Sequence, residues 1–395
     1  MPQNWKTYKL SDVATVQTGP FGSQLHKKDY VKVGTPIITV EHLGENRITY
    51  QNLPRIKNED KNRLSKYHLK EGDVVFSRVG SVDRRALVTK SEDGWLFSGR
   101  CLRVRAKDSL ASGSFLSYYF GKESFKDYIR RIAVGATMPS INTSILSNIE
   151  IKLPPLSEQR AIASILSAID DKIELNLQMN KTLEDMAMAL YKHVFVYFGP
   201  FQTGEFVDSK LGRIPKGWEV KRLEDILEIK YGKDHKKLTA GNIPVYGSGG
   251  IMRYVDQFLY DQDSILIPRK GTLSNLFYLT TPFWSVDTMF YSKIKIKHFG
   301  KYVFYFLKSI DLASMDVGSA VPSLTTELLK RITTLAPPIL EIVKFDETVT
   351  RYFKTMESNS IENKTLTKLR DTLLPKLISG KVRVKDIEQT VAQVL

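Results

Sequence analysis

Polar side chains that can bind base edges and phosphate groups gather in three loops in the first half of the chain. Arginine, lysine, asparagine and glutamine can recognise bases, whereas glycine and small hydroxyl residues let a backbone come close to a phosphate. A glycine-bracketed loop, the arginines after a short apolar run and a hydroxyl-rich loop near residue 140 have this composition. The residues expected to contact a nucleic acid are Gln17, Thr18, Gly19, Ser23, Gln24, Lys27, Lys28, Arg78, Arg84, Arg85, Thr137, Ser140 and Asn142.

The second half of the chain contains a comparable set of polar residues. They are Lys230, Tyr231, Lys233, Lys236, Tyr246, Ser248, Arg269, Lys270, Ser319 and Ser323. For Arg78 and Arg269, the alternative to nucleic-acid contact is a salt bridge or a solvated surface charge. For the loops around Ser140 and Ser323, the alternative is a turn that both halves share for folding. We expect residues that differ between the halves to read bases and shared residues to hold the backbone.

No residues in the sequence have the spacing of a catalytic or metal site. There is no glycine-rich cofactor loop that opens a helix, no Gly-Lys-Ser or Gly-Lys-Thr phosphate loop, and no Asn-Pro-Pro-aromatic motif of an amino-methyltransferase. Glu150-Ile-Lys152 and Glu228-Ile-Lys230 superficially resemble fragments of a nuclease site, but each lies in an alternating strand pattern. The six histidines lack metal-ligand spacing. We expect no catalytic residue, metal or cofactor in this chain.

These loops belong to an internal repeat. The segment 134–146 reappears 183 residues later as 317–329, and both copies run into a double proline. At the front of each half, 5–19 corresponds to 218–232 at an offset of 213, so the first half carries about thirty more residues. Between these segments, each half has a short apolar run that ends in an arginine and a glycine, which predicts a buried strand. The duplication indicates approximate two-fold symmetry, which suits binding to duplex DNA.

Each half continues into a long helical pattern with an apolar seam. The seams begin at Ile162 and Phe345, advance in steps of four and three, and match at an offset of 183 in all positions but one, where Arg370 corresponds to Ala187. A sustained 3.5-residue period is typical of a left-handed coiled coil. The alternative is that both helices form the core of one globular body.

Two amides lie in the middle of each seam, where polar residues usually fix register. Because the chain must leave one globule, reach the other and leave it again, the simplest arrangement of the helices is antiparallel. Asn176 would then face Asn363, and Asn180 would face Asn359. A helix of about 39 residues is roughly 58 Å long at ~1.5 Å per residue, longer than the ~34 Å of one DNA turn. The sequence therefore predicts two half-sites separated by an unread spacer of fixed length.

Composition limits the function classes further. The chain has 395 residues, 42% of them hydrophobic, with no apolar run long enough to span a membrane and no signal-peptide pattern. Its only cysteine is Cys101, so we expect a soluble, cytoplasmic protein without a membrane partner. The net charge is +15, and both long helices are nearly neutral, so positive charge is concentrated on the globules. This distribution indicates a polyanionic partner, although general solubility of a basic protein is the alternative.

Three motifs carry a family resemblance. They are Leu153-Pro-Pro-Leu-Ser-Glu-Gln-Arg at the entry to the first helix with its continuation to 174, the hinge 208–218, and the segment 369–380. Over nearly its whole length the chain resembles the specificity subunit of type I restriction-modification systems. The second helix entry, 338–345, departs from the pattern because it lacks the Ser-Glu-Gln-Arg form.

The resemblance implies a chain without chemistry of its own that recognises a bipartite double-stranded DNA target. Two modification subunits that methylate adenine with S-adenosylmethionine dock on its helices, and restriction subunits that use ATP and Mg can join. It implies an α/β (α+β) fold with two pseudo-two-fold-related target recognition domains separated by two long antiparallel coiled-coil helices. The expected parts are a first recognition domain (1–155), a central helix (156–198), a linker (199–216), a second recognition domain (217–338), a C-terminal helix (339–380) and a tail (381–395).

Two other functions stay open at this point. The first is a coiled-coil adaptor whose basic globules bind nucleic acid without sequence preference. The second is a self-sufficient nuclease or methyltransferase, which the absence of catalytic motifs in the sequence disfavours.

Overall fold

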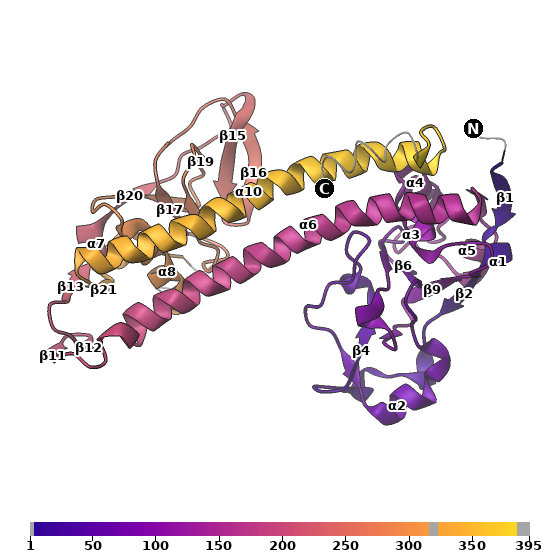
Figure 1. Cartoon of the computed structure of the whole chain (residues 1–395), viewed down its shortest axis with the longest axis horizontal. Helices are drawn as coiled ribbons and strands as arrows, with labels where there is room; N and C mark the ends of the chain where they lie inside the picture. Colours follow the sequence, from indigo (N-terminus) through magenta and orange to yellow (C-terminus); the bar gives the residue numbers. More distant parts are fainter. Residues whose placement is uncertain (1–3, 316–322, 385–395) are drawn as a thin grey trace. The chain divides into compact units, whose positions relative to one another are not determined.

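The computed structural model describes residues 4–315 and 323–384, which form two compact units. Unit 1 contains the chain up to Leu175 together with the residues from Ile361 onward, and unit 2 contains Asn176–Ser360. Each of the two long helices, α6 (Leu156–Tyr191) and α10 (Ile339–Ile378), contributes one half to each unit (Figure 1).

Unit 1 is built on a four-stranded antiparallel sheet with strand order β2-β9-β6-β7. Its strands are β2 (Ala14–Thr18), β9 (Cys101–Ala106), β6 (Val74–Ser77) and β7 (Arg85–Leu87). A second sheet contains β3 (Tyr30–Val31), β5 (Arg55–Ile56), β4 (Thr35–Ile38) and β8 (Leu96–Phe97), the last two in parallel. A third pairs β1 (Lys6–Lys9) with β10 (Glu150–Leu153). The helices are α1 (Leu10–Val13), α2 (Asn58–Arg63), α3 (Gly113–Gly121), α4 (Glu123–Ile132) and α5 (Thr143–Ser147).

Unit 2 repeats this plan with the strand order β14-β20-β17-β18. These strands are β14 (Leu227–Tyr231), β20 (Met289–Ile294), β17 (Ser264–Pro268) and β18 (Phe277–Leu279). A second sheet contains β16 (Gly250–Val255), β15 (Ala240–Gly247) and β19 (Trp284–Ser285). Two further pairs are β13 (Glu219–Arg222) with β21 (Thr333–Ala336), and β11 (Phe206–Ser209) with β12 (Gly212–Pro215). The helices are α7 (Leu223–Ile226), α8 (Phe299–Ser309) and α9 (Thr326–Arg331).

The two units therefore share one topology. In each, the third strand of the four-stranded sheet is buried along its whole length, as the short apolar runs predicted. In each, the second sheet contains a parallel pair, β4 with β8 and β15 with β19. The duplication inferred from the sequence is thus present in the fold.

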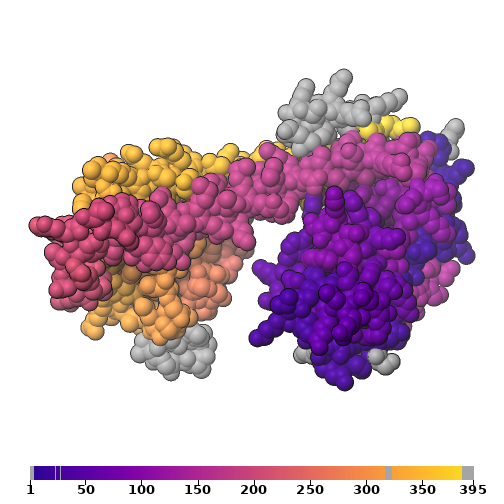
Figure 2. Space-filling view, turned by 60° about the horizontal axis from the view of Figure 1, so that its bottom comes forward, coloured from indigo at the N-terminus to yellow at the C-terminus, as the bar shows by residue number. Residues whose placement is uncertain are grey.

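The long helices pack together in antiparallel orientation. In unit 1, the N-terminal half of α6 shares a core with the C-terminal half of α10, through Leu166 and Leu366 among others. In unit 2, the C-terminal half of α6 shares a core with the N-terminal half of α10, through Tyr191 and Phe345, and the two segments run side by side in both views (Figure 1, Figure 2). The antiparallel pair expected from the sequence is confirmed, and the alternative of one globular body is wrong.

The entries to the two helices are stabilised differently. The buried side chain of Gln159 accepts a hydrogen bond from the Ser112 amide at 3.0 Å and donates to the carbonyls of Leu110 and Pro154 at 3.1 and 2.9 Å. This amide fastens the start of α6 to unit 1. In the second copy, Ile342 stands 183 residues later and is fully buried, so apolar packing replaces the hydrogen bonds. At its other end α6 continues as a π-helical turn, Lys192–Val196.

One of the seam amide pairs is hydrogen-bonded within unit 2. Asn359 donates from Nδ2 to Oδ1 of Asn180 at 2.8 Å, and Asn180 donates to the carbonyl of Met356 at 3.4 Å. In unit 1, Asn363 donates to the carbonyl of Ile173 at 3.4 Å. The expected pairing of Asn176 with Asn363 would join the two units and stays a prediction, as does the role of these amides in fixing register.

We expect Asn359→Leu to destabilise the chain by about 1 to 2 kcal/mol, because the amide of Asn180 then loses its partner inside an apolar seam. The double variant Asn180→Leu/Asn359→Leu should be more stable than either single variant, since neither amide of this pair is left without the other. Thermal unfolding of the full chain followed by calorimetry measures both effects. Ser358→Leu, on the exposed face of the same helix, is the matched control. A double variant less stable than both single variants would contradict the prediction.

Candidate nucleic-acid interface

In each unit, the repeated loop lies against the residue that follows the buried central strand. In unit 1 the amide of Ile141 donates to the carbonyl of Arg78 at 2.9 Å, and in unit 2 the amide of Leu324 donates to the carbonyl of Arg269 at 2.9 Å. Ser140 bridges to Val79 in the same way that Ser323 bridges to Lys270. The same backbone contacts therefore place an arginine beside a hydroxyl residue where the inner strand β6 or β17 ends, a place called the sheet edge below.

Arg78 spans the ends of two strands in unit 1. Its guanidinium donates to the carbonyl of Gly99 at 3.1 Å and to Oγ1 of Thr18 at 3.3 Å. Among the described residues, no carboxylate forms an ion pair with it. The salt bridge considered as an alternative is therefore not observed in the described part of the chain, where no carboxylate neutralises the half-buried guanidinium.

Arg269 has the corresponding place in unit 2 with different neighbours. It donates to the carbonyl of Asp287 at 3.2 Å and lies over the ring of Tyr231, 5.4 Å from the centroid, a cation–π geometry. Within residues 4–315 and 323–384 it also has no ion-pair partner. The next residue, Lys270, is exposed.

The glycines at the ends of β2 and β14 are required for packing. A Cβ on Gly19 would come within 2.3 Å of the carbonyl oxygen of Ser98, and one on Gly232 within 2.0 Å of that of Val286. Gly19 is itself buried. The neighbouring loop of the protein thus explains why a glycine is needed here, and the expected approach of its backbone to a phosphate stays a prediction.

Arg85 is used inside unit 1, which argues against its predicted contact with DNA. Its side chain is only 3% exposed, pairs with Glu45 at 2.8 Å and donates to the carbonyl of Ser117 at 2.9 Å. A Cβ on Gly121 would lie 1.9 Å from its guanidinium, so this glycine makes room for it. A buried and neutralised guanidinium cannot reach DNA. Its neighbour Arg84 is half-buried and donates to the carbonyl of Leu43.

Asn142 has a structural role in unit 1. Its Oδ1 accepts a hydrogen bond from the amide of Ile145 at 2.8 Å and caps α5, just as Thr325 caps α9 by accepting from Leu328 at 3.2 Å. The two caps are 183 residues apart. This capping role supports the alternative for this loop, a turn shared for folding, and the expected contact of the exposed Asn142 with DNA stays a prediction.

The other predicted residues of unit 1 vary in exposure. Thr137 and Lys28 are exposed, whereas Ser140 donates to the carbonyl of Val134 at 3.2 Å. The side-chain oxygens of Gln17 and Gln24 accept from Arg103 and Tyr67. Ser23 and Lys27 fall in the short 3-10 helices Gly22–Gln24 and Lys27–Asp29.

In unit 2, Lys233 and Lys236 are exposed in the loop after β14. Lys230 pairs with Glu228 at 2.6 Å, and this hydrogen bond holds the pKa of Glu228 below its ordinary value, so the lysine charge is largely neutralised. Tyr246 packs against Phe277. The carbonyl of Ser248 accepts from Asn275 at 2.9 Å. Ser319 lies outside the described residues.

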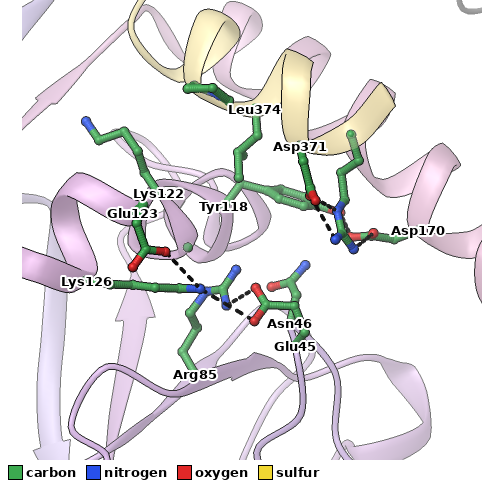
Figure 3. A pocket seen from close by; sticks show the side chains of 13 residues that line it. Glu45, Asn46, Arg85, Tyr118, Lys122, Glu123, Lys126, Asp170, Asp371 and Leu374 are labelled. Atoms are coloured by element: carbon green, nitrogen blue, oxygen red, sulfur yellow. Dashed lines mark hydrogen bonds and ion pairs between the residues drawn. The ribbon is translucent and has the colours of Figure 1, made fainter. Parts of the chain in front are cut away.

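A polar cavity of about 400 Å³ in unit 1 was not anticipated from the sequence (Figure 3). Within it, Arg370 of α10 pairs with Asp170 of α6 at 3.0 Å, and Tyr118 of α3 donates to the same carboxylate at 2.7 Å. Burial of the Tyr118 hydroxyl beside Asp170 raises its pKa well above the ordinary value. Glu45 also lines the cavity; burial favours its protonated form, but Arg85 and Lys126 outweigh this effect and lower its pKa.

The charged groups of this cavity largely neutralise one another. Because these pairs include Arg370 of α10 and Asp170 of α6, they hold α10 against unit 1. The only sequence feature that pointed to this cavity was the one position at which the two seams differ, where Arg370 corresponds to Ala187. Ala187 is fully buried in the apolar core of unit 2, where an unpaired charge would be strongly destabilising. The mismatch thus marks an ion pair that unit 1 has and unit 2 lacks at this position.

The described residues contain no group of three or more His, Cys, Asp or Glu side chains that could hold a metal ion. Across the same residues, no helix combines the length and apolarity needed to cross a membrane.

Comparison with known proteins yields one family. A model described as the type I restriction modification DNA specificity domain matches residues 2–185 and 215–370. The type I restriction enzyme MjaIX specificity subunit of Methanocaldococcus jannaschii is 27% identical, with 98% of this chain and 95% of the relative covered. The HindI specificity subunit of Haemophilus influenzae is 23% identical, with 96% and 100% covered. The crystal structure of a type I restriction-modification system S subunit from M. genitalium has the same fold, with a TM-score of 0.65 at 19% identity over 95% of this chain and 96% of that one.

We expect Arg370→Ala to destabilise unit 1 by about 2 kcal/mol, because it leaves the carboxylate of Asp170, 8% exposed, without its cation. The loss should fall below that of a fully buried pair because Arg370 is itself 20% exposed. Adding Asp170→Asn should restore part of the stability, since a neutral amide can still accept from Tyr118 without a buried charge. Calorimetry of the full chain measures the change. Equal melting temperatures for the wild type and Arg370→Ala would show that the pair does not stabilise the unit.

Proposed function

The chain belongs to the family of type I restriction-modification specificity subunits, the non-catalytic subunits that give these systems their DNA specificity, and we propose that its two units read the two halves of a bipartite double-stranded target. Unit 1 would bind one half-site and unit 2 the other. The bases between the half-sites would not be read.

The observation that carries this proposal is the repeated sheet edge with an unneutralised arginine. The scaffold is the same in both units, because the amides of Ile141 and Leu324 bind the carbonyls of Arg78 and Arg269 at the same distance. The surroundings differ, since Arg78 touches Thr18 whereas Arg269 lies over Tyr231. A common frame with different side chains suits two units that read different base sequences.

The proposed DNA-contact set leaves out Gly19, Arg85 and Asn142, whose structural roles are stated above. It also leaves out Lys230, which pairs with Glu228, and Ser23, Lys27 and Ser319, whose side chains lie outside the described residues. The set comprises residues at the sheet edges and in the neighbouring loops. They are Gln17, Thr18, Gln24, Lys28, Arg78, Arg84, Thr137 and Ser140 in unit 1, and Tyr231, Lys233, Lys236, Tyr246, Ser248, Arg269, Lys270 and Ser323 in unit 2. Lysines are assigned to phosphates, and arginines to base edges.

The long helices are proposed to dock two modification subunits, which would carry S-adenosylmethionine and methylate adenine. Restriction subunits that use ATP and Mg would join the same complex. Exposed apolar side chains on α6, namely Leu177, Met179 and Met186, support a protein-docking role for this helix. The chain itself would hold no cofactor.

The competing adaptor function predicts binding without sequence preference. Methylome sequencing of cells that carry this chain and a modification subunit would first reveal the target. Binding of that duplex is then compared with binding of a scrambled duplex of equal length at fixed salt, with the modification subunit present. A specificity subunit should prefer the target by a factor of about 10³ or more. Equal affinities would support the adaptor.

We expect Arg78→Ala to weaken binding by ~1 to 3 kcal/mol only when the first half-site is correct, and Arg269→Ala to do so only for the second. The reason is that each arginine would contact bases in one half-site alone. Electrophoretic mobility shifts with targets scrambled in one half at a time measure the two effects separately. A uniform loss across all duplexes would mean that these arginines bind phosphates.

Arg130→Ala is the matched control for both variants. Arg130 is an exposed arginine of unit 1, but Asp83, Glu123 and Asp127 pair with it at 2.6, 3.1 and 2.8 Å. Its substitution should leave DNA binding unchanged. Arg78→Gln, which can still donate to Gly99, separates loss of the cation from local rearrangement of the strand ends.

A further inference from the structure

Apolar side chains gather on the outer strand of the hairpin β15–β16 in unit 2. Ile251, Met252 and Tyr254 are 48%, 59% and 44% exposed. β16 is an edge strand, because the order of its sheet is β16-β15-β19. An exposed apolar edge strand invites aggregation, and proteins usually protect such edges with charge or cover. Its presence here calls for a partner.

Met252 lies at a β-bulge of this hairpin. Val245 pairs with Arg253 and Tyr246 pairs with Ile251, so Met252 is the extra residue on its strand. Bulges redirect side chains and are common next to binding sites. A Cβ on Gly247 would lie 2.6 Å from the sulfur of Met252, so the glycine lets this side chain lie across the hairpin.

Met252 lies next to the candidate DNA-binding edge of unit 2. The position that a Cβ on Gly247 would take, beside the sulfur of Met252, is also 3.7 Å from the side chain of Val286. The carbonyl of the following residue, Asp287, accepts the hydrogen bond from Arg269 at 3.2 Å. The hairpin turn is also held here, because Asn275 donates to the carbonyl of Ser248 at 2.9 Å. The apolar strand and the unneutralised arginine therefore border one surface.

The hairpin also carries the lysine loop of this unit. Arg253 of β16 donates to the carbonyls of Leu238 and His235 at 2.5 and 3.3 Å. These bonds tie the loop that contains the exposed Lys233, Lys236 and Lys237 to the strand beside Met252. Positive charge thus flanks the apolar side chains, which matches the phosphates that flank a base edge in duplex DNA.

We propose that Met252 packs against the C5-methyl group of a thymine in the half-site read by unit 2, and so determines specificity at that base pair. A two-stranded β-ribbon fits the major groove, and the thymine methyl is the apolar group that the standard bases present there. A methionine side chain is flexible and polarisable enough to follow such a small surface. This inference rests on the proposed function of unit 2 as a DNA reader.

The experiment removes single methyl groups from the DNA. Once the target is known, each thymine of the second half-site is replaced in turn by deoxyuridine, which lacks only the C5-methyl. For the wild-type chain in complex with its modification subunit, one replacement should weaken binding about threefold to tenfold. Met252→Ala should bind the thymine and deoxyuridine duplexes equally, whereas Met252→Leu should retain the preference.

Val207→Ala is the matched control, since Val207 is an exposed apolar residue of the other hairpin, β11–β12, in the same unit. It should keep the wild-type ratio of the two affinities. Because Met252 is largely exposed, its variants should fold, and their melting temperatures check this.

The possible outcomes separate the two levels of inference. If the chain prefers no target over scrambled duplex, the proposed function fails. If a target is preferred but its second half-site lacks thymine, or tolerates deoxyuridine at every position, the role of Met252 is overturned while the proposed function stands. If Met252→Ala prevents binding of the modification subunit and leaves the thymine preference intact, the strand is a protein-docking surface and the inference is wrong.

Discussion

Each unit completes its hydrophobic core with half of a helix whose other half belongs to the other unit. In unit 1, the buried leucines Leu366, Leu373 and Leu377 of α10 pack with Ile162 and the rest of the α6 seam. Burying one such side chain stabilises by ~1.5 to 3 kcal/mol, so the three leucines together contribute roughly 5 to 9 kcal/mol. That is comparable with the whole net stability of a typical domain, about 5 to 15 kcal/mol. Unit 1 therefore depends on α10 for its stability, and the candidate nucleic-acid interface of this unit depends on α10 indirectly.

Features with a regular period or a repeated motif could be predicted from the sequence. The 3.5-residue period of the seams predicted both long helices. With the helices antiparallel, it also predicted that Asn180 faces Asn359, and these two amides are hydrogen-bonded. The repeat gave the equivalent positions of Arg78 and Arg269 at the two sheet edges. In each case the information is local, or is copied at a fixed offset along the chain.

Features that depend on distant partners could not be predicted. The sequence predicted Arg85 as a surface cation. Its side chain is buried, and its partners, Glu45 and the carbonyl of Ser117, are about forty and thirty residues away in the sequence. The packing requirement of Gly19 comes from Ser98. The bulge at Met252 arises from the pairing of two strands and has no signature in residue type alone. Sequence patterns thus located the loops of the candidate site, whereas three-dimensional contacts decided which of their side chains are available.

The shared core of unit 1 also has a consequence for synthesis of the chain. Leu366 is translated 200 residues after Leu166, the residue whose core it completes. At ~5 to 20 residues per second, a ribosome needs roughly 10 to 40 s to cover that distance. For this interval the α6 seam of unit 1 lacks the leucines of α10 that cover it in the finished chain. Production of the intact protein is therefore sensitive to ribosome pausing and to premature stop codons between these two helices.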